Sequence, residues 1–594
     1  MLSRLLIFVL TLVLPAAVQA QTLAAPEAAS DRATNALVRA KRHMIVAANP
    51  YAADAGLKTL RAGGSAVDAA IAAQLVLNLV EPQSSGLGGS GFLLHWDKQS
   101  AQLKSYDGRE TAPASARPDR FLQDGQPVKF RSAMNSGASI GVPGVIAMLA
   151  DAHRQHGKLA WRALFQPAID LATAGFVVSP RLNALLKRSG ADYFTPPGRR
   201  YFFDDAGEPR PVGYLLRNPE FAKTLRTIAE RGPNAVHDGE IGQAIVAAAA
   251  SANGLPSGMT PTDLANYRAI VRPPVCAPYS GYRVCGMGPP SSGALTVAQA
   301  LFMLERFDLG TSPADAANAN AVHLIAQAQR LAFADRKRYM ADPDHAPIPS
   351  GLLDPAYLTT RAQLINPERA AERVTHGLPP GLSRRGYGRD HTIEGAGTTH
   401  VSIVDAAGNA VSMTTSVGTA FGSGVWAAGF LLNNELTDFS FRPTDDDGTA
   451  IANAVEPGKR PRSSMNPTIV FGPDKQLFAV LGSPGGSRII LYVMKGIIGL
   501  IDWKLDAQQA ADLLNFGNRG GPLEIEKRAS ALSGGPTLPW QDAPAPWFQS
   551  RLEPRGHTIR PATTTSGLHV IVRRNGSLFG GADPRREGVA RGDD

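Results

Sequence analysis

Hydrophobic residues form two kinds of segment in this chain. The stretches Met44–Pro50 and Phe92–Trp96 are short and mostly apolar, which predicts strands. Residues 65–80 are apolar on nearly every side and rich in alanine, which predicts a helix buried between layers. Because such a helix needs apolar partners all round, the pattern predicts helices packed on sheets.

The middle of the chain has a mainly helical spacing of apolar residues. This spacing predicts helices near 145–156, 160–174, 219–231, 294–306 and 315–341. A later apolar run, Ile489–Ile501, predicts another helix. Residues 568–586 predict a hairpin with an Asn575-Gly576 turn.

Another predicted hairpin begins at three small residues. Gly395-Ala396-Gly397 lead into a β-branched strand that starts at Thr398, followed by a turn at Asp405–Asn409 and a second strand of alternating pattern. Small residues give little steric cover, so we expect the start of this hairpin to be accessible. On its own, a strand pair that begins with two threonines indicates no chemistry.

Composition and charge narrow the class of protein. The 594 residues are 44% hydrophobic and 19% charged, which suffices for a large core. The sequence shows no internal repeat or low-complexity tract, so we expect one compact unit. The net charge is +9, but the basic residues are scattered and form no long run. A basic surface without a nucleic-acid partner is therefore expected.

Residues 1–20 have the features of a cleavable export signal. Arg4 precedes an apolar run from Leu5 to Leu14, and a small-x-small ending leads to Ala20. The apolar run is shorter than the roughly 20 residues that a membrane-spanning helix needs, so a retained anchor is less expected. The sequence predicts a periplasmic or secreted protein with no stable membrane anchor.

The chain has two cysteines, Cys276 and Cys285. They lie on two short predicted strands around a turn, so in an oxidising compartment we expect them to form a disulfide. Its role would be structural, because redox pairs usually have the closer Cys-x-x-Cys spacing.

No metal site and no cofactor are predicted. His153 and His156 have a spacing that could suit a metal, but no third ligand lies nearby in the sequence. We interpret them as part of a solvated helix face. Asp445–Asp447 is likewise interpreted as a solvated loop rather than a cation site.

Five motifs together resemble the γ-glutamyltransferase family of the N-terminal nucleophile hydrolase superfamily. In chain order they are Thr-Thr-His-x-Ser-x-x-Asp-x-x-Gly-Asn-Ala-Val from Thr398, Phe-Gly-Ser-Gly from Phe421, Leu-Asn-Asn-Glu from Leu432, Lys-Arg-Pro-Arg-Ser-Ser-Met from Lys459 and Gly-Ser-Pro-Gly-Gly-Ser-Arg from Gly482. The resemblance extends over nearly the whole chain after residue 20. It implies an α/β (α+β) fold, a four-layer αββα sandwich.

The resemblance also implies self-cleavage between Gly397 and Thr398. Thr398 would become an N-terminal nucleophile, and its own α-amino group, with a pKa near 8, would act as the base. The fragments 21–397 and 398–594 would form a heterodimer that works as one catalytic unit. Leu378–Asp390, rich in proline, glycine and arginine, is expected to be an exposed, mobile linker that lets the new end move away.

Residue roles follow by position from the family's motifs. Ser416 would contact the nucleophile, and the N–H groups of Gly485 and Gly486 would stabilise the oxyanion. The substrate's α-carboxylate would be held by Arg109, Ser463 and Ser464. Its α-ammonium would be held by Glu435 and Asp438.

Two departures from the family's pattern leave the substrate open. Gly418 stands where many members have an asparagine that contacts the glutamyl group, and the lid at 440–452 is short and lacks a tyrosine. We expect a γ-glutamyltransferase, or glutathione hydrolase, that transfers the γ-glutamyl group of glutathione to water, amino acids or peptides. A glutaryl or cephalosporin acylase is the alternative. An exported, non-catalytic binding protein is less expected, because Thr398 and the glycine pair are retained.

Overall fold

Two seven-stranded antiparallel sheets lie face to face in the middle of the molecule. The computed structural model describes residues 35–382, 386–395 and 397–593. One sheet has the order β1 (Val38–Ala40), β22 (Ser577–Ala582), β21 (His569–Arg574), β17 (Leu477–Gly482), β16 (Thr468–Phe471), β11 (Tyr282–Gly286) and β10 (Val275–Tyr279). The other has the order β23 (Val589–Asp593), β2 (His43–Ala47), β12 (Gly397–Val404), β13 (Ala410–Gly418), β3 (Ser90–Asp97), β4 (Gln102–Gly108) and β9 (Ile270–Arg272).

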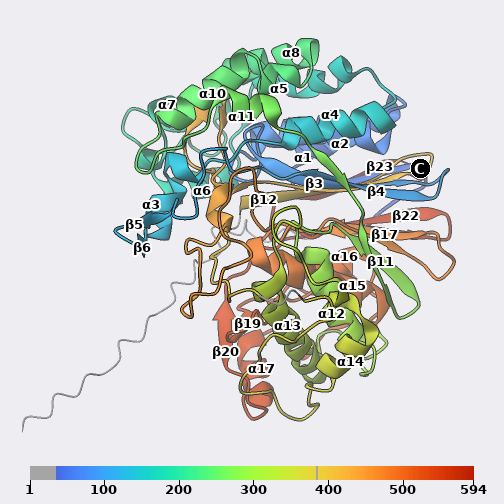
Figure 1. The fold of residues 1–594 in the computed structure, drawn as a ribbon. Coiled ribbons are helices and arrows are strands. Elements are labelled where there is room, and N and C mark those ends of the chain that lie inside the picture. The colour runs from blue at the N-terminus through green and yellow to red at the C-terminus, as the bar shows by residue number, and fades with distance from the viewer. Residues whose placement is uncertain (1–34, 383–385, 396, 594) are drawn as a thin grey trace, which may run out of the picture.

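Helices cover the outer face of each sheet (Figure 1). Beside the sheet that contains β12 lie α1 (Pro50–Arg61), α2 (Ala66–Val80), α4 (Val145–His156), α5 (Gln166–Ala174), α8 (Pro219–Arg231), α10 (Glu240–Ala250) and α11 (Pro261–Asn266). Beside the other lie α12 (Gly293–Leu304), α13 (Ala319–Tyr339), α14 (Pro355–Ala362), α15 (Ile489–Ile501), α16 (Ala507–Asp512) and α17 (Pro544–Leu552). The predicted αββα sandwich is therefore confirmed.

Smaller elements fill the connections between these layers. The further helices are α3 (Phe130–Met134), α6 (Pro180–Ser189), α7 (Pro196–Phe202) and α9 (Asn234–His237). Short strands pair as β5 (Leu122–Gln123) with β6 (Gln126–Pro127), β7 (Phe176–Val177) with β8 (Leu215–Leu216), β14 (Trp426–Ala427) with β15 (Phe430–Leu431), and β18 (Phe516–Gly517) with β19 (Leu523–Glu526) and β20 (Ile559–Ala562).

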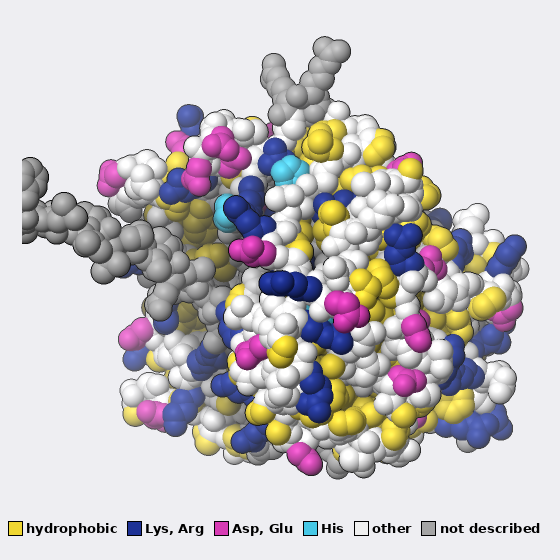
Figure 2. All heavy atoms as spheres, turned by 90° about the horizontal axis from the view of Figure 1, so that it is seen from below, with side chains coloured by type: hydrophobic (Ala, Val, Ile, Leu, Met, Phe, Trp, Pro, Cys, Tyr) yellow, Lys and Arg dark blue, Asp and Glu magenta, His cyan; other side chains and the backbone are white. Residues whose placement is uncertain are grey.

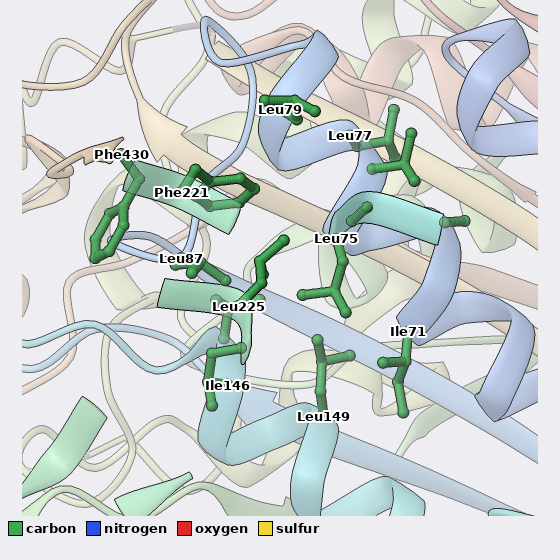
Figure 3. Packing of buried hydrophobic residues seen from close by; sticks show 14 of the residues in the cluster. Ile71, Leu75, Leu77, Leu79, Leu87, Ile146, Leu149, Phe221, Leu225 and Phe430 are labelled. Carbon is green, nitrogen blue, oxygen red and sulfur yellow. The ribbon is translucent and has the colours of Figure 1, made fainter. Parts of the chain in front are cut away.

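The apolar helix predicted at 65–80 lies between layers, as α2. Ser65 and Asp68 form a reciprocal capping box, in which each side chain accepts a hydrogen bond from the other's backbone N–H. All residues of α2 are buried. Figure 3 shows Leu75 and Leu77 of α2 within the same apolar cluster as Leu149 of α4. This cluster supports one face of the sheet that carries β12 and β13.

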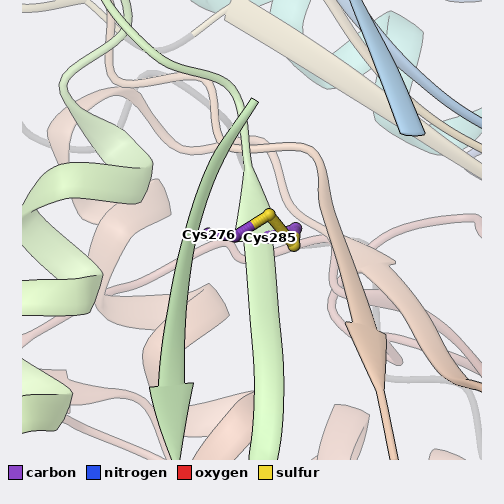
Figure 4. The surroundings of a disulfide bond; sticks show 2 residues. All are labelled: Cys276 and Cys285. Carbon is purple, nitrogen blue, oxygen red and sulfur yellow. A yellow bond between two sulfur atoms is a disulfide. The ribbon is translucent and has the colours of Figure 1, made fainter. Parts of the chain in front are cut away.

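Most predicted elements occur at the predicted positions. The helices expected at 145–156, 219–231 and 489–501 are α4, α8 and α15. The segment 160–174 begins instead with a 3-10 turn and becomes α5 at Gln166, next to Pro167. Cys276 and Cys285 stand opposite each other on β10 and β11 and are joined, as expected (Figure 4).

The interpretation of His153 and His156 as a solvated face was wrong. The His153 ring is hydrogen bonded to the carbonyl of Leu159, and the His156 ring to the hydroxyl of Tyr106 at 2.7 Å. The His156 ring also stacks on that of His95. Both histidines thus tie α4 to neighbouring segments, which their spacing along the helix could not indicate.

Basic and acidic side chains are mixed on the surface, as the scattered basic residues in the sequence predict. Figure 2 shows Lys and Arg side chains interspersed with Asp and Glu over the face of the molecule that it presents. In the described part of the chain, no helix combines the length and apolarity required to cross a bilayer. The predicted export signal at 1–20 lies outside the described residues.

Candidate active site

The predicted cleavage point lies at the first two residues of β12. Thr398 pairs with Ser416 on β13, and Gly397 pairs with Gly418, with an irregularity in the ladder between Gly397 and Thr398. Gly397 has no room for a side chain, because a Cβ atom there would meet the carbonyl carbon of Thr419 at 2.4 Å. The peptide bond predicted to break is therefore held closely against β13.

Ser416 is aimed at this peptide bond. Its Oγ donates a hydrogen bond to the carbonyl oxygen of Gly397 at 2.9 Å and accepts one from the N–H of Gly418, also at 2.9 Å. Because the Gly418 N–H takes up a lone pair of Oγ, the hydroxyl hydrogen is free to point at the Gly397 carbonyl. Ser416 can thus stabilise negative charge on that oxygen.

Thr398 lines a small cavity of about 20 Å³ together with most of the other predicted site residues. The lining comprises Arg109, Glu394, Gly395, Thr398, Ser416, Gly418, Asp438, Ser463, Ser464, Met465, Gly486 and Ile489. Gly485 adjoins this lining, and Glu435 reaches it through Arg109. The structure therefore brings together residues from distant parts of the sequence that were predicted to share a site.

The expectation that the start of the hairpin is accessible was wrong for this continuous chain. Thr398 is only 3% exposed. Glu394 and Gly395, in the segment just before it, form part of the cavity lining. Small residues reduce steric cover from their own side chains, but they do not prevent neighbouring side chains from closing over them.

Arg109, at the end of β4, is surrounded by three carboxylates. Its guanidinium lies 2.6 Å from Glu435, 2.6 Å from Asp438 and 3.3 Å from Glu110. Burial raises the pKa of Asp438 to about 7, although the Arg109 charge opposes this shift. Burial also raises the pKa of Glu110 well above its usual range. One fixed cation and several acids thus meet at the wall of the cavity.

Glu394, four positions before Thr398, was not predicted as a site residue. Its carboxylate contacts Arg336 at 2.5 Å and Arg462 at 3.1 Å, and accepts a hydrogen bond from Ser464. Burial would raise its pKa, but the two arginines and Ser464 lower it to about 2. Its place directly before the small residues at 395–397 was the one signal in the sequence.

The linker expected at 378–390 is only partly exposed. Leu378 is exposed, whereas Asp390 is buried and its carboxylate lies 2.8 Å from Arg462. Residues 383–385 lie outside the described residues. The end of this segment is therefore fastened to the cavity wall by ion pairs, which correct the expectation of a freely mobile linker there.

A buried polar layer beneath the nucleophile strand was also missed. The Thr399 hydroxyl donates to Glu81 at 3.0 Å, and the Thr415 hydroxyl donates to Gln74 at 2.8 Å. Burial raises the pKa of Glu81 to about 7, despite the nearby Arg181. Because Gln74 belongs to α2, these bonds fix the hairpin against that helix.

The predicted oxyanion glycines have backbone conformations that favour glycine. Gly485 has φ +139° and Gly486 has φ +57°. A Cβ atom at Gly485 would meet the Tyr492 ring at 2.6 Å. A short 3-10 turn, Gly486–Arg488, then leads into α15, and N–H groups at a helix start lack intrahelical partners. The loop can therefore offer N–H groups to an anion.

Position 418 requires glycine both because of the neighbouring atoms and because of its backbone conformation. Its φ is +99°, and a Cβ atom would come within 2.1 Å of Asn434 Oδ1. The Asn434 side chain thus occupies the space that a side chain at position 418 would enter. An asparagine at 418 does not fit this site unless Asn434 moves.

Similarity to known proteins identifies the family of this chain. Residues 52–592 match the family described as Gamma-glutamyltranspeptidase. The chain belongs to this family. It is 35% identical to the glutathione hydrolase proenzyme of Escherichia coli (strain K12), over 92% of this chain and 91% of that protein.

Relatives with a different named activity are equally similar. The acylase ACY 1 proenzyme of Pseudomonas sp. (strain V22) is 34% identical over 92% of this chain and 93% of its own length. The crystal structure of a cephalosporin acylase from Bacillus halodurans superimposes with a TM-score of 0.78 and 28% identity, covering 95% of this chain and 98% of that one. The chain is thus an enzyme of the gamma-glutamyltranspeptidase family with the family's fold, and membership alone does not select the acyl group.

Proposed function

We propose that this chain is a self-processing γ-glutamyltransferase, or glutathione hydrolase, in which Thr398 is the nucleophile. The observation that carries the proposal is the hydrogen bond from Ser416 Oγ to the Gly397 carbonyl, at the wall of a cavity that also contains Asp438 and Gly486. It combines a hydroxyl nucleophile, a polarised amide carbonyl and a candidate oxyanion loop.

Self-cleavage proceeds in two steps. The Thr398 hydroxyl oxygen attacks the carbonyl carbon of Gly397, and the negative charge that develops on the carbonyl oxygen is stabilised by Ser416. The C–N bond breaks as the nitrogen takes up the proton that the hydroxyl loses, which leaves Gly397 as an ester on the Thr398 oxygen and frees the Thr398 α-amino group. Water then hydrolyses the ester and yields a carboxylate at Gly397 and a free hydroxyl at Thr398.

Substrate turnover uses the same hydroxyl with its new base. The α-amino group of Thr398 takes the hydroxyl proton as the oxygen attacks the γ-carbonyl of the donor, and then returns a proton to the leaving amine. The N–H groups of Gly485 and Gly486 hold the oxyanion of each tetrahedral intermediate. Water or an amino acid accepts the γ-glutamyl group, so the products are glutamate or a γ-glutamyl compound.

The acidic residues favour a γ-glutamyl donor over other acyl groups. Glu435 and Asp438 contact Arg109, and Asp438 also lines the cavity. Two carboxylates can receive the α-ammonium of a glutamyl group, with Arg109 fixing their positions. A glutaryl group has no ammonium and would leave this acidic pair without a ligand.

The fragments 21–397 and 398–594 are proposed to remain together after the cut. From Thr398 onward, β12 and β13 belong to the second fragment, but they pair with β2 and β3 of the first. Separation would expose both edges of the hairpin. Export to the periplasm or the medium, directed by residues 1–20, remains a proposal that the Cys276–Cys285 disulfide supports.

A glutaryl or cephalosporin acylase is the second candidate. Gly418 provides no side chain for a glutamyl group, and acylases are among the similar proteins. The absence of this contact lowers selectivity for the α-amino acid end of the donor. It leaves the nucleophile and the oxyanion loop unchanged, so the two candidates share one mechanism.

The test compares the native chain with Thr398→Ala, and with Thr360→Ala as a control at an exposed threonine on α14. Each is examined by denaturing gel and intact mass, and assayed with γ-glutamyl- and glutaryl-p-nitroanilide. We expect the native chain and the control to split before Thr398 and to prefer the γ-glutamyl amide, while Thr398→Ala stays whole and inactive. Cleavage with a preference for the glutaryl amide selects the acylase. An uncut, inactive native chain would support a binding protein.

A further inference from the structure

We propose that a basic cavity beside α13 is a second binding site, and that its ligand is a compact anion with two or more phosphate or carboxylate groups. The cavity lies between α13, residues 372–376, Arg389 and the loop at Arg519, and its volume is about 280 Å³. It is called the basic cavity below. Among the described residues, none lines both the basic cavity and the cavity at Thr398. The inference needs neither self-cleavage nor turnover, so it does not depend on the proposed function.

The lining of the basic cavity is rich in cations. Arg330, Lys337 and Arg338 lie on one face of α13, because seven or eight positions correspond to about two helical turns. Ala334 lies on the same face, and its small side chain leaves space above the helix. Six basic side chains stand against one acidic side chain, Glu372, in the described lining. The basic residues are Arg330, Lys337, Arg338, Arg373, Arg389 and Arg519.

Several of these cations have no acidic partner. In the part of the chain that the structure describes, the side chains of Lys337, Arg338 and Arg389 form no ion pair. Asp445 contacts Arg389 through the backbone N–H of that residue, at 3.2 Å. Lys337 and Arg338 are half-buried, so their charges are hydrated less completely than those of surface cations. A bound anion would therefore be stabilised by charges that the protein itself leaves unmatched.

Arg330 is fixed at the wall of the basic cavity by neutral acceptors. Its guanidinium donates hydrogen bonds to the backbone carbonyls of Ala371 at 2.5 Å and Glu372 at 3.2 Å. Within the described residues, its buried Nε atom has no hydrogen-bond partner. Backbone carbonyls orient the guanidinium without cancelling its charge, so Arg330 adds to the positive potential of the cavity.

Arg519, on the other side of the basic cavity, is only partly neutralised. It donates a hydrogen bond to Ser487 Oγ at 2.6 Å and lies 3.1 Å from the Glu524 carboxylate. Glu524 also pairs with Arg488 and Arg560, so one carboxylate serves three guanidiniums. Arg519 is therefore held in one orientation and retains positive charge for a ligand.

Two titratable groups respond to this positive potential. Burial, with Arg389 and Arg336 close by, lowers the pKa of Lys337 to about 8. Burial and the Arg338 charge lower the pKa of His376, which also lines the basic cavity. Both shifts mean that further positive charge is disfavoured there, and a bound anion would reverse this effect.

Size and charge together define the class of ligand. Small-molecule sites usually have volumes of about 300–1,000 Å³, so a cavity of about 280 Å³ suits a compact ligand. Guanidinium groups match phosphate and carboxylate oxygens, and several of them around one cavity favour a ligand with more than one anionic group. Diphosphate and citrate are suitable probes of the two sources of such groups.

The first experiment titrates the uncut Thr398→Ala chain with diphosphate, and separately with citrate, by calorimetry at an ionic strength held constant with sodium chloride. This variant is uncut whether or not the native chain cleaves itself, so failure of the proposed function does not affect the result. We expect one saturable site for at least one of the two anions. Binding of diphosphate alone identifies a phosphate ligand, citrate alone a polycarboxylate, and both a site for either group. No saturable binding of either anion would overturn the proposal.

The second experiment adds Lys337→Gln and Arg389→Gln to the same chain. Lys223→Gln with Arg231→Gln is the matched control, because both residues are exposed on α8, which covers the other sheet (Figure 1). We expect the first pair to weaken anion binding at least about tenfold and the control pair to change it less than about threefold. Melting temperatures without anion show that both variants fold. Equal effects of the two pairs would overturn the proposal, because net charge alone would then explain binding.

Hydrogen exchange locates the anion without any substitution in the basic cavity. The anion that binds should slow amide exchange in residues 372–376, which line the basic cavity, and leave the β12–β13 hairpin unchanged. Slower exchange confined to that hairpin would place the anion at the nucleophile and would overturn a separate site.

Discussion

The Oγ atom of Ser416 lies 2.9 Å from the carbonyl oxygen of Gly397 and donates a hydrogen bond to it. This relationship is set by strand pairing, because Thr398 stands opposite Ser416 in the β12–β13 ladder. The ladder therefore places a hydroxyl donor at the carbonyl that precedes the nucleophile, before any substrate is present.

Replacement of Ser416 by alanine should slow self-cleavage. Loss of one oxyanion donor typically lowers a rate by about 10²- to 10³-fold, and Ser416 is the donor that the structure places on the Gly397 oxygen. A time course of fragment appearance on denaturing gels measures the rate. Ser416→Thr keeps the hydroxyl and should mature faster than Ser416→Ala. Equal maturation of the native chain and Ser416→Ala would contradict this role.

A core substitution in α2 should destabilise the whole molecule. Leu75 is fully buried in the cluster that Figure 3 shows, so Leu75→Ala should lower the free energy of unfolding by about 2–5 kcal/mol. Denaturant unfolding of the uncut Thr398→Ala background gives the value. Leu378→Ala is the matched control, since Leu378 is 74% exposed, and should change it by less than about 0.5 kcal/mol. Similar losses at both positions would show that α2 is not a central layer.

Local patterns in the sequence predicted much of the fold. The apolar spacing predicted the positions of α4, α8 and α15, because residues on one face of a helix lie only three or four positions apart in the sequence. The contacts of Glu394 could not be predicted in this way. Arg336 is 58 residues and Arg462 is 68 residues from Glu394, so only the folded chain brings them together. The family's motifs located Ser464 but gave no indication of Arg336.

The burial of Thr398 also could not be predicted from local sequence patterns. Small residues before the nucleophile led to the expectation of an accessible site, whereas Gly397 lies close against Thr419. They gave no information about Asp390 and Glu394, whose ion pairs fasten the segment over the cavity. Charge pairing between distant residues decided accessibility, and single-sequence patterns do not contain it.

A side chain at position 418 should lower the free energy of unfolding without improving recognition of the glutamyl group. Gly418→Asn places a side chain at φ +99° and forces Asn434 to move, so we expect a loss of about 1–3 kcal/mol in the free energy of unfolding. Thermal unfolding and KM for γ-glutamyl-p-nitroanilide measure both effects. Adding Asn434→Ala should recover part of the stability by making room. A stable Gly418→Asn with a lowered KM would show that the site accepts the side chain common in the family.

The pH dependence of donor choice should report on Asp438. Its pKa is raised by burial to about 7, and only the carboxylate form can pair with an α-ammonium. The charged form dominates above pH 7 and is lost as the pH falls below it. The ratio of kcat/KM for γ-glutamyl- to glutaryl-p-nitroanilide should therefore fall between pH 8 and pH 6, by up to about tenfold per unit below the pKa. The Thr398 amine affects both donors equally, so its titration cancels in the ratio. Asp438→Asn, which cannot ionise, should give a low ratio that does not change with pH. A constant ratio in the unaltered enzyme would mean that Asp438 does not bind the ammonium.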